Sequence, residues 1–166
     1  MRVNIALLTV TDTRTLKNDK SGRILVEKIK KANHNLIDRK ICKDSKNEIK
    51  KILKEWTKRK KIDVIITTGG TGLTGRDITP EALNELADKH IPGFGEIFRT
   101  ISLETVGTSS IQSRACAILA KGKYIFALPG SSGGVTDAWD KILIHQLDIN
   151  HKPCNFIELL PRLKEK

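Results

Sequence analysis

The sequence predicts one α/β domain with a parallel sheet, spanning residues 1–166. First, Val64–Thr68 is a short, apolar and β-branched run, as expected of a strand buried inside a parallel sheet. Second, this run and a later one, Lys123–Leu128, each end in a glycine-rich loop that leads into a helix. Third, no linker, low-complexity run or internal repeat divides the chain, so we expect a single domain with residues 150–166 as a C-terminal packing tail.

The first half of the chain predicts two strand-and-helix pairs. Residues 1–10 contain an apolar run that predicts a first strand, and the apolar residues after Gly22 predict the helix that follows it. Residues 36–42 alternate enough in polarity to predict a second, more exposed strand. The next helix follows Ser45, because apolar residues recur on one helix face at positions i, i+3, i+4 and i+7: Ile49, Ile52, Leu53 and Trp56.

The second half of the chain predicts four more helices around its remaining strand. Residues 80–89 predict a helix, because Thr79 is a good N-cap and the proline after it suits the first helical position. Residues 94–101 and 113–119 predict two further helices. Apolar residues within residues 135–143 predict a last helix that faces the core.

The stretch TTGGTGLTGRDITPEAL, residues 67–83, joins the strand Val64–Thr68 to the next helix. Glycines let backbone N–H groups approach an anion, and a helix N-terminus adds partial positive charge, so this loop predicts binding of a phosphorylated ligand. Two known patterns match it only in part. Gly70 to Gly75 spells GxGxxG but does not lead directly into its helix, and a P-loop requires Lys where Arg76 stands.

Two aspartates that follow strands are candidates for the chemistry. Asp77 lies two residues after the last glycine of the loop, and a carboxylate beside phosphates suggests Mg²⁺-assisted phosphoryl or nucleotidyl transfer. The alternative is that Asp77 only caps a turn before the helix. Asp44 follows the second strand as Asp77 follows the third, so both carboxylates could face one cleft. Alternatively, Asp44 is an N-cap or pre-cap residue of the next helix.

A second glycine loop, PGSSGG at residues 129–134, repeats the order of strand, loop and helix. Alone it could be a flexible turn, but its position predicts that a ligand, or two ligands, span the cleft between the two glycine loops. Arg14 lies in the loop that leaves the first strand, at the strand end where open α/β sheets bind ligands. It could reach a phosphate, or it could form a surface pair with Asp12 or Asp19.

Composition argues against several classes of function. The net charge of +11 favours anionic ligands in general, but aromatic residues make up only 4%, so a nucleic acid site is not predicted. No stretch reaches membrane-spanning length and no secretory signal is recognisable, so we expect a soluble, cytoplasmic protein without a membrane partner. The 3 cysteines and 4 histidines lack metal-ligand spacing and predict neither a disulfide framework nor a transition-metal site.

Four segments together resemble the MoaB/MogA family of molybdenum cofactor biosynthesis proteins: TTGGTGLTGRDITPEAL, PGFGEIFRTIS, SSIQSRA and LPGSSGGVTDAW. They occur in the family's order and spacing, and the resemblance covers nearly the whole chain, including TDTR and DKSG near the start. The segment QLDINHKPCNF resembles the MoaB branch in particular. The resemblance implies a three-layer α/β/α sandwich with a mostly parallel, partly mixed central sheet, which is the molybdopterin-binding fold.

The resemblance also implies a function and a set of partners. The family binds molybdopterin, a pterin with a dithiolene and a terminal phosphate. Its adenylyltransferase members transfer AMP from Mg-ATP to that phosphate, which prepares the pterin for metal insertion. The family assembles as homotrimers or homohexamers, alongside other molybdenum cofactor biosynthesis proteins. A second interpretation is an oligomer of the same pathway that binds molybdopterin, or acts as a scaffold, without catalysis.

Site residues are carried over from the family motif by motif. Its functional aspartates match Asp44 and Asp77, the expected catalytic residues and Mg²⁺ ligands, and its two ligand loops match residues 68–72 and 129–133. Loop amides and nearby serines are expected to position the pterin, and arginines to act as charge clamps. The expected substrate-binding residues are Thr68, Gly69, Gly70, Thr71, Gly72, Ser109, Pro129, Gly130, Ser131, Ser132, Gly133, Arg14, Arg76 and Arg114.

Overall fold

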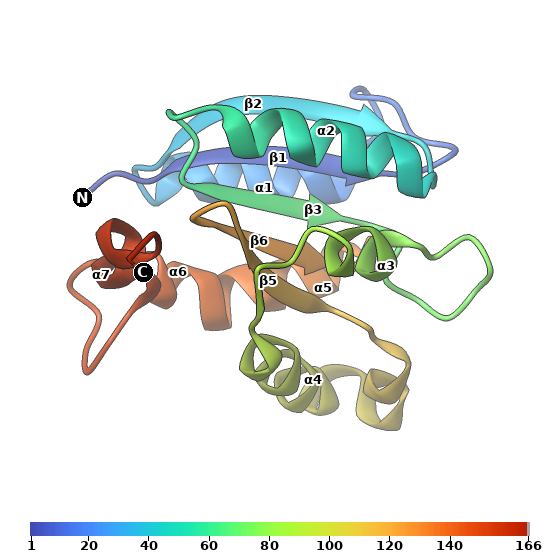
Figure 1. Cartoon of the computed structure of the whole chain (residues 1–166). Coiled ribbons are helices and arrows are strands. Elements are labelled where there is room, and N and C mark those ends of the chain that lie inside the picture. Colours follow the sequence, from blue (N-terminus) through green and yellow to red (C-terminus); the bar gives the residue numbers. More distant parts are fainter. Residues whose placement is uncertain (166) are drawn as a thin grey trace.

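The computed structural model describes residues 1–165 and contains a six-stranded sheet (Figure 1). The strands are β1 (Asn4–Val10), β2 (Asn35–Cys42), β3 (Val64–Thr68), β4 (Lys89–His90), β5 (Cys116–Ala120) and β6 (Lys123–Leu128). They lie in the order β2-β1-β3-β6-β5-β4. β2, β1, β3 and β6 are parallel, whereas β5 is antiparallel to both β6 and β4. The expected mostly parallel, partly mixed sheet is therefore confirmed.

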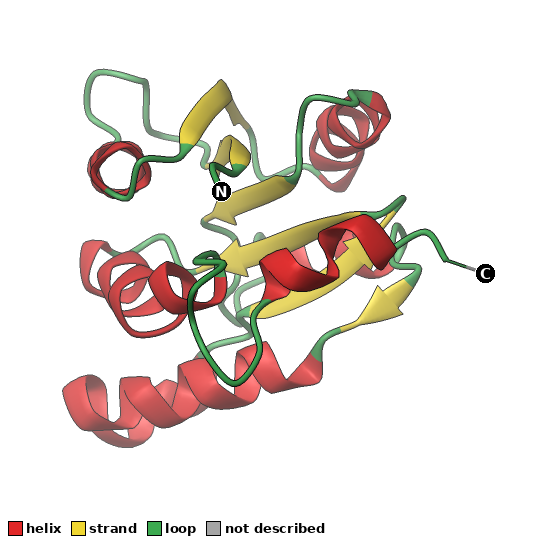
Figure 2. Ribbon diagram, turned by 90° about the vertical axis from the view of Figure 1, so that its left-hand side faces the viewer, coloured by secondary structure: helices red, strands yellow, loops and turns green. Residues whose placement is uncertain are grey.

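Helices cover both faces of this sheet (Figure 2). The helical segments are α1 (Lys20–Lys31), α2 (Lys46–Lys58), α3 (Thr79–Asn84), α4 (Pro92–Val106), η1 (Gly107–Gln112), α5 (Ser132–Ala138), η2 (Trp139–Leu143), α6 (Ile144–Gln146), α7 (Phe156–Leu159) and η3 (Leu160–Arg162). α2 and α3 pack on one face, while α1, α4 and α5 pack on the other. The molecule thus has three layers, and the expected α/β/α sandwich is confirmed.

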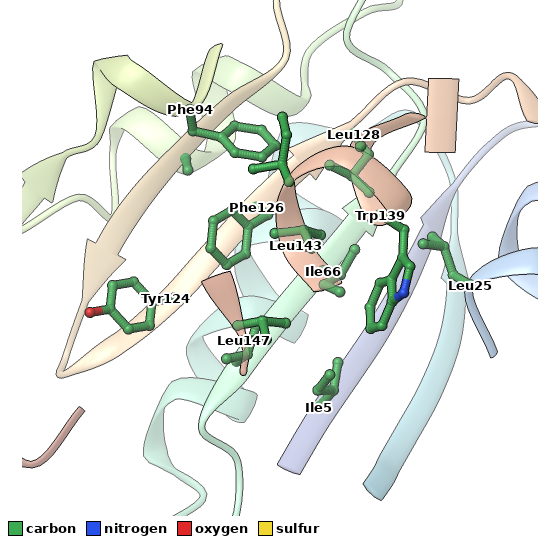
Figure 3. Packing of buried hydrophobic residues seen from close by; sticks show 14 of the residues in the cluster. Ile5, Leu25, Ile66, Phe94, Tyr124, Phe126, Leu128, Trp139, Leu143 and Leu147 are labelled. Carbon is green, nitrogen blue, oxygen red and sulfur yellow. The ribbon is translucent and has the colours of Figure 1, made fainter. Parts of the chain in front are cut away.

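Two apolar cores fill the spaces between these layers. Successive side chains of β1 point to opposite faces of the sheet, so Ile5 enters the larger core and Ala6 the smaller one. Figure 3 shows the larger core, where the rings of Phe94 and Phe126 pack with centroids 5.1 Å apart. In the smaller core Trp56 is fully buried, as its helical spacing predicted. Both faces of the sheet are therefore closed, and ligand access is left to its ends.

The helix predicted over residues 113–119 is wrong, because Cys116–Ala120 forms β5. Within this strand Ala117 joins the larger core and Ile118 the smaller, which is the alternation of a strand buried on both faces. A two-residue turn, Lys121-Gly122, connects β5 to β6, and both residues have positive φ (53° and 73°). Such a turn matches the twist of an antiparallel hairpin. The short apolar run did not distinguish a strand from a helix, whereas the turn favours the strand.

The helix predicted over residues 80–89 is shorter than expected. α3 ends at Asn84, and Lys89–His90 form the edge strand β4. Thr79 lies inside the helix instead of capping it, and its Oγ1 donates a hydrogen bond to Gly69 O (2.9 Å). The threonine hydroxyl therefore fastens the glycine loop to the start of α3.

The C-terminal residues pack against the end of the larger core. The ring of Phe156 lies 4.7 Å from that of Tyr124, and Ile157 is buried. Asn155 caps α7 by accepting a hydrogen bond from the N–H of Glu158 (2.9 Å). Among residues 1–165, no helix has the length and apolar character that crossing a membrane requires.

Candidate functional site

The loops after β1, β3 and β6 gather at the carboxyl edge of the parallel strands. From β1 the chain crosses through α1 to β2, and it later returns through α2 to β3 on the opposite side of β1. Open α/β sheets bind ligands at such a reversal of strand order, outside the carboxyl ends of the strands. The first glycine loop, residues 69–78, leaves β3 at this point and projects beyond the sheet (Figure 1).

Two adjoining clefts surround these loops. The larger cleft has a volume of about 950 Å³ and the smaller a volume of about 440 Å³. Gly70, Asp77, Gly130 and Ser131 line both, so the clefts meet where the two glycine loops meet. α4 and η1 form another wall of the larger cleft with Phe98, Ser102, Thr105, Val106, Ser109 and Ser110.

Close contacts explain two of the glycines in the first loop. Gly69 has φ +102°, and an added Cβ would lie 2.2 Å from the carbonyl oxygen of Val10. Gly70 has φ +67°, and its Cβ would lie 2.4 Å from Thr79 Oγ1 and 3.1 Å from Asp44 Oδ1. Residues with side chains are strained at such φ values. The two glycines therefore let the loop backbone pack directly against the end of β1 and against the carboxylate of Asp44.

Asp77 folds back onto its own loop. Its Oδ2 accepts hydrogen bonds from the N–H (2.8 Å) and the Oγ1 (2.7 Å) of Thr74, so the turn-capping role considered for it is present. A Cβ at Gly72 would lie 2.7 Å from the same oxygen. Burial acts to raise the pKa of Asp77, but the hydrogen bonds from Thr74 and Gly72 and the charge of Arg114 outweigh it and lower the pKa. Asp77 is therefore charged at neutral pH while still lining both clefts.

Asp44 lies on the smaller cleft, beside Gly70. The N-cap of α2 is Ser45, so Asp44 is the pre-cap residue and its carboxylate is not used for capping. The N–H of Asp44 donates to Asp12 Oδ1 (3.1 Å). Burial, followed by the charges of Asp12 and Asp77, raises the pKa of Asp44. The two predicted aspartates thus share the smaller cleft, with Asp12 next to Asp44 but outside the cleft lining, and a cation would relieve the repulsion between these carboxylates.

Mg²⁺ fits this donor set. It prefers oxygen ligands, and in nucleotide sites it is bound through one or two carboxylates together with phosphate oxygens and water. Asp44 and Asp77 would be its protein ligands here. In the described chain, residues 1–165, no group of three or more His, Cys, Asp or Glu side chains is arranged to hold a metal ion. Phosphate oxygens of a substrate would therefore have to complete the coordination.

The second glycine loop is tied directly to the first. The hydroxyl of Thr68 donates to the carbonyl oxygen of Pro129 (2.7 Å), and the N–H of Gly69 donates to Leu128 O (3.0 Å). Ser131 is the N-cap of α5, and its Oγ accepts a hydrogen bond from the N–H of Gly134 (3.1 Å). Ser132 and Gly133, at the start of this helix, also line the larger cleft, and the N–H groups at a helix start favour an anion.

Arg14 and Arg76 lie on the rim of the smaller cleft. Nη1 of Arg14 donates to Gly130 O (3.1 Å) and to Ser21 Oγ (3.1 Å), so it joins the loop after β1 to the second glycine loop. The surface pair considered for Arg14 with Asp12 is formed by Arg76 instead, at 3.6 Å. The side chain of Arg76 is 78% exposed, so it can move toward an anionic ligand.

Arg114 is the predicted site residue that lines neither cleft. It precedes β5 and lies behind the first glycine loop, beside a separate cavity of about 570 Å³. Its Nε donates to Gly72 O (2.7 Å), its Nη2 donates to Asp77 O (2.7 Å), and its Nη1 is paired with Glu81. The guanidinium therefore contacts the backbone of the loop.

Comparison with known proteins assigns the chain to a family. A family described as "Probable molybdopterin binding domain" matches residues 6–149. The chain belongs to this family. Its place in molybdenum cofactor biosynthesis follows from its relatives, as the resemblance of its motifs predicted.

Named relatives match this molybdopterin-binding domain over most of their length. The chain is 43% identical to molybdenum cofactor biosynthesis protein B of Escherichia coli strain K12 over 152 residues, covering 92% of the chain and 89% of that protein. The protein of the same name in Bacillus cereus is 43% identical over 146 residues, covering 87% and 86%. A crystal structure of molybdenum cofactor biosynthesis protein B has a TM-score of 0.90 at 38% identity, covering 100% of this chain and 98% of that chain. The tungsten cofactor synthesizing protein MoaB from Pyrococcus furiosus has a TM-score of 0.81 at 33% identity, covering 99% and 98%.

In this molybdopterin-binding domain, every predicted site residue except Arg114 lines one or both of the two clefts. Their proposed roles in binding and catalysis stay predictions. Sequence reasoning did not predict that Asp12, in the TDTR segment after the first strand, accepts a hydrogen bond from the N–H of Asp44 beside the smaller cleft. It also missed the wall from α4, because Phe98 and Val106 lie far from both loops in the sequence and only the fold brings them there.

Proposed function

We propose that this protein binds molybdopterin in the larger cleft and transfers AMP from ATP to its terminal phosphate, with Mg²⁺ present. The observation that carries the proposal is the pair Asp44 and Asp77, which both line the smaller cleft, with Asp77 also lining the larger cleft where the two meet. A transfer between two anionic substrates needs such a junction, because charge has to be neutralised between them. The presence of both aspartates favours catalysis over a role as a molybdopterin-binding oligomer without turnover.

The proposed step exchanges one bond for another. A terminal phosphate oxygen of molybdopterin attacks the α-phosphorus of ATP, a P–O bond forms, and the bond to the bridging oxygen of the leaving pyrophosphate breaks. Mg²⁺, when bound, supplies positive charge to the phosphates. Asp44 and Asp77 would hold it, and Arg14 and Arg76 on the rim would bind phosphate oxygens of ATP.

The chain's own residues divide the two substrates between the clefts. The larger cleft offers an apolar wall of Phe98 and Val106 to the pterin ring, with Ser109 and the start of α5 for its polar and anionic groups. The smaller cleft is lined mainly by polar and charged residues and would take the triphosphate of ATP. Gly70 and Gly130 line both clefts and would present backbone groups to both ligands.

Self-association belongs to the same proposal. Exposed apolar side chains on α4 and η1 support assembly as a homotrimer or a homohexamer, because a neighbouring subunit would shield them from water. These side chains are Ile97, Leu103, Val106 and Ile111. Other molybdenum cofactor biosynthesis proteins would be the further partners.

The test is adenylyl transfer by the purified protein with molybdopterin, ATP and Mg²⁺, following adenylylated molybdopterin directly. Asp77→Ala and Asp77→Asn should abolish the product, because both remove a charged ligand while asparagine keeps an acceptor for Thr74. Asp140→Ala, which removes an exposed aspartate that pairs with Lys28 and lines neither cleft, is the matched control and should keep full activity. Full transfer by Asp77→Ala would refute the assignment. Molybdopterin binding without any product from the wild type would instead support the non-catalytic alternative.

A further inference from the structure

Arg114 holds the first glycine loop by three hydrogen bonds from one residue. Its backbone N–H donates to Thr71 O (2.9 Å). Its side chain donates from Nε to Gly72 O and from Nη2 to Asp77 O, both at 2.7 Å. These carbonyls stand at the beginning and the end of the turn that carries Thr74 and the Asp77 carboxylate. One guanidinium therefore fixes the distance between the two ends of that turn.

Arginine is suited to this contact, and lysine is not. The guanidinium is planar and presents its N–H donors in a fixed fork, so two of them can reach two carbonyl oxygens at once. A lysine ammonium is a single point of charge on a flexible stem. The fork at Arg114 consequently specifies geometry as well as charge, and an equal charge without the fork would not reproduce it.

Glu81 holds the guanidinium from the other side. It lies in the first turn of α3 and pairs with Nη1 of Arg114, while α3 is also bonded to the loop through Thr79. The hydrogen bond from Arg114 lowers the pKa of Glu81, so the pair is charged at neutral pH. Glu81 lines neither of the two clefts, which separates its role from any contact with a ligand.

We infer that Arg114 is a positioning residue for the Asp77 carboxylate, acting through the loop backbone and held in place by Glu81. The inference rests on the proposed function for its effect on catalysis, but its effect on the loop stands independently. It replaces the expectation that Arg114 binds a ligand anion directly. The guanidinium already donates to Gly72, Asp77 and Glu81, so turning the side chain toward the clefts would break these three contacts.

The two roles predict opposite effects for Glu81→Gln. If Arg114 bound the ligand directly, removing the competing charge of Glu81 would free the guanidinium and strengthen the binding of anionic substrates. If Arg114 positions the loop, the same substitution loosens its anchor and weakens activity. Arg114→Lys separates the roles a second time, because a lysine keeps the positive charge that direct binding needs but loses the fork.

The first experiment measures loop order without any ligand. Amide hydrogen exchange of residues 69–78 should be about tenfold faster or more in Arg114→Lys, Arg114→Gln and Glu81→Gln, since local opening controls exchange. Arg59→Gln is the matched control, because Arg59 pairs with Asp38 away from the clefts. Loss of the Arg59 guanidinium should leave hydrogen exchange in residues 69–78 unchanged. Unchanged exchange in both Arg114 variants would overturn the inference.

The second experiment measures the site. In the transfer assay, the Mg²⁺ concentration for half-maximal rate should rise at least threefold in Arg114→Lys and in Glu81→Gln. The double variant Arg114→Gln/Glu81→Gln should have the same half-maximal Mg²⁺ concentration as Arg114→Gln alone, because the effects of substitutions at paired residues are not additive. Improved activity of Glu81→Gln, or normal activity of Arg114→Lys, would overturn the inference in favour of direct binding.

Failure of the proposed function would look different from failure of this inference. If the wild type transfers no AMP, the exchange experiment still decides whether Arg114 orders the loop. Mn²⁺ affinity measured by electron paramagnetic resonance then replaces the rate as the readout of the site. It should fall in Arg114→Lys and not in Arg59→Gln, and equal affinity in the wild type and Arg114→Lys would refute the positioning role.

Discussion

The Gly70→Ala variant should unfold at a clearly lower urea concentration than the wild type. At φ +67° a residue with a Cβ is strained by about 1–2 kcal/mol. The new Cβ would also lie 2.4 Å from Thr79 Oγ1, which donates a buried hydrogen bond to Gly69 O. Displacing that hydroxyl adds about 1 kcal/mol. The free energy of unfolding should therefore fall by about 2–3 kcal/mol in total.

The assay is urea unfolding followed by tryptophan fluorescence, because Trp56 and Trp139 are both buried. Gly75→Ala is the matched control, since no atom of residues 1–165 beyond its chain neighbours would lie within 4 Å of the new Cβ and its φ is not in the left-handed region. It should change the free energy of unfolding by less than about 1 kcal/mol, toward greater stability, by restricting the unfolded chain. Protein concentration is held constant in case the chain self-associates. Equal midpoints for the two variants would show that the close approach at Gly70 does not constrain the loop.

Two other predictions concern titratable groups. Burial lowers the pKa of His34, whose Nδ1 accepts a hydrogen bond from the N–H of Val3 (3.3 Å), so the unfolded chain takes up the proton first as the pH falls. Stability should decrease as the pH falls from about 7 through 6.5, and His34→Asn should flatten that slope in urea titrations; an unchanged slope would refute this assignment. Burial also raises the pKa of Cys42 to about 12 and that of Cys116 to about 11, whereas Cys154 is exposed. A thiol reagent at neutral pH should therefore label Cys154 first in peptide mapping, and faster labelling of either of the others would contradict it.

The parts of the fold that could be predicted from sequence are those with a strong local signal. β3 was recognisable because five apolar and β-branched residues end at once in glycines, and α2 because its apolar face repeats at helical spacing. β5 was missed because CAILA is compatible with a buried helix as well as a buried strand. Its pairing with β6 decides between them, and the local signal for that pairing is the two-residue turn Lys121-Gly122, which the helix prediction did not use.

The candidate site was predictable to a similar extent. Its two glycine loops and the aspartates 44 and 77 were recognisable because a strand end fixes where the next few residues go. The partner of Arg114 was not, because a sequence gives no information on whether a guanidinium meets a ligand anion or a backbone carbonyl. The apolar wall from α4 was also missed, since Phe98 reaches the cleft only through the packing of α4 on the sheet.

The reversed direction of β5 has a consequence for how this edge of the sheet is built. In a purely parallel sheet, only segments that leave strands reach the carboxyl edge, and segments that enter strands arrive at the far end. Because Cys116 at the start of β5 pairs with Ala127 near the end of β6, the segment entering β5 arrives at the carboxyl edge. It brings Arg114 and the end of η1 with it. Because β5 is antiparallel, the segment that leads into it lies at the same edge as the loops that follow β1, β3 and β6. Residues on that segment can therefore contact the first glycine loop from the side away from the clefts.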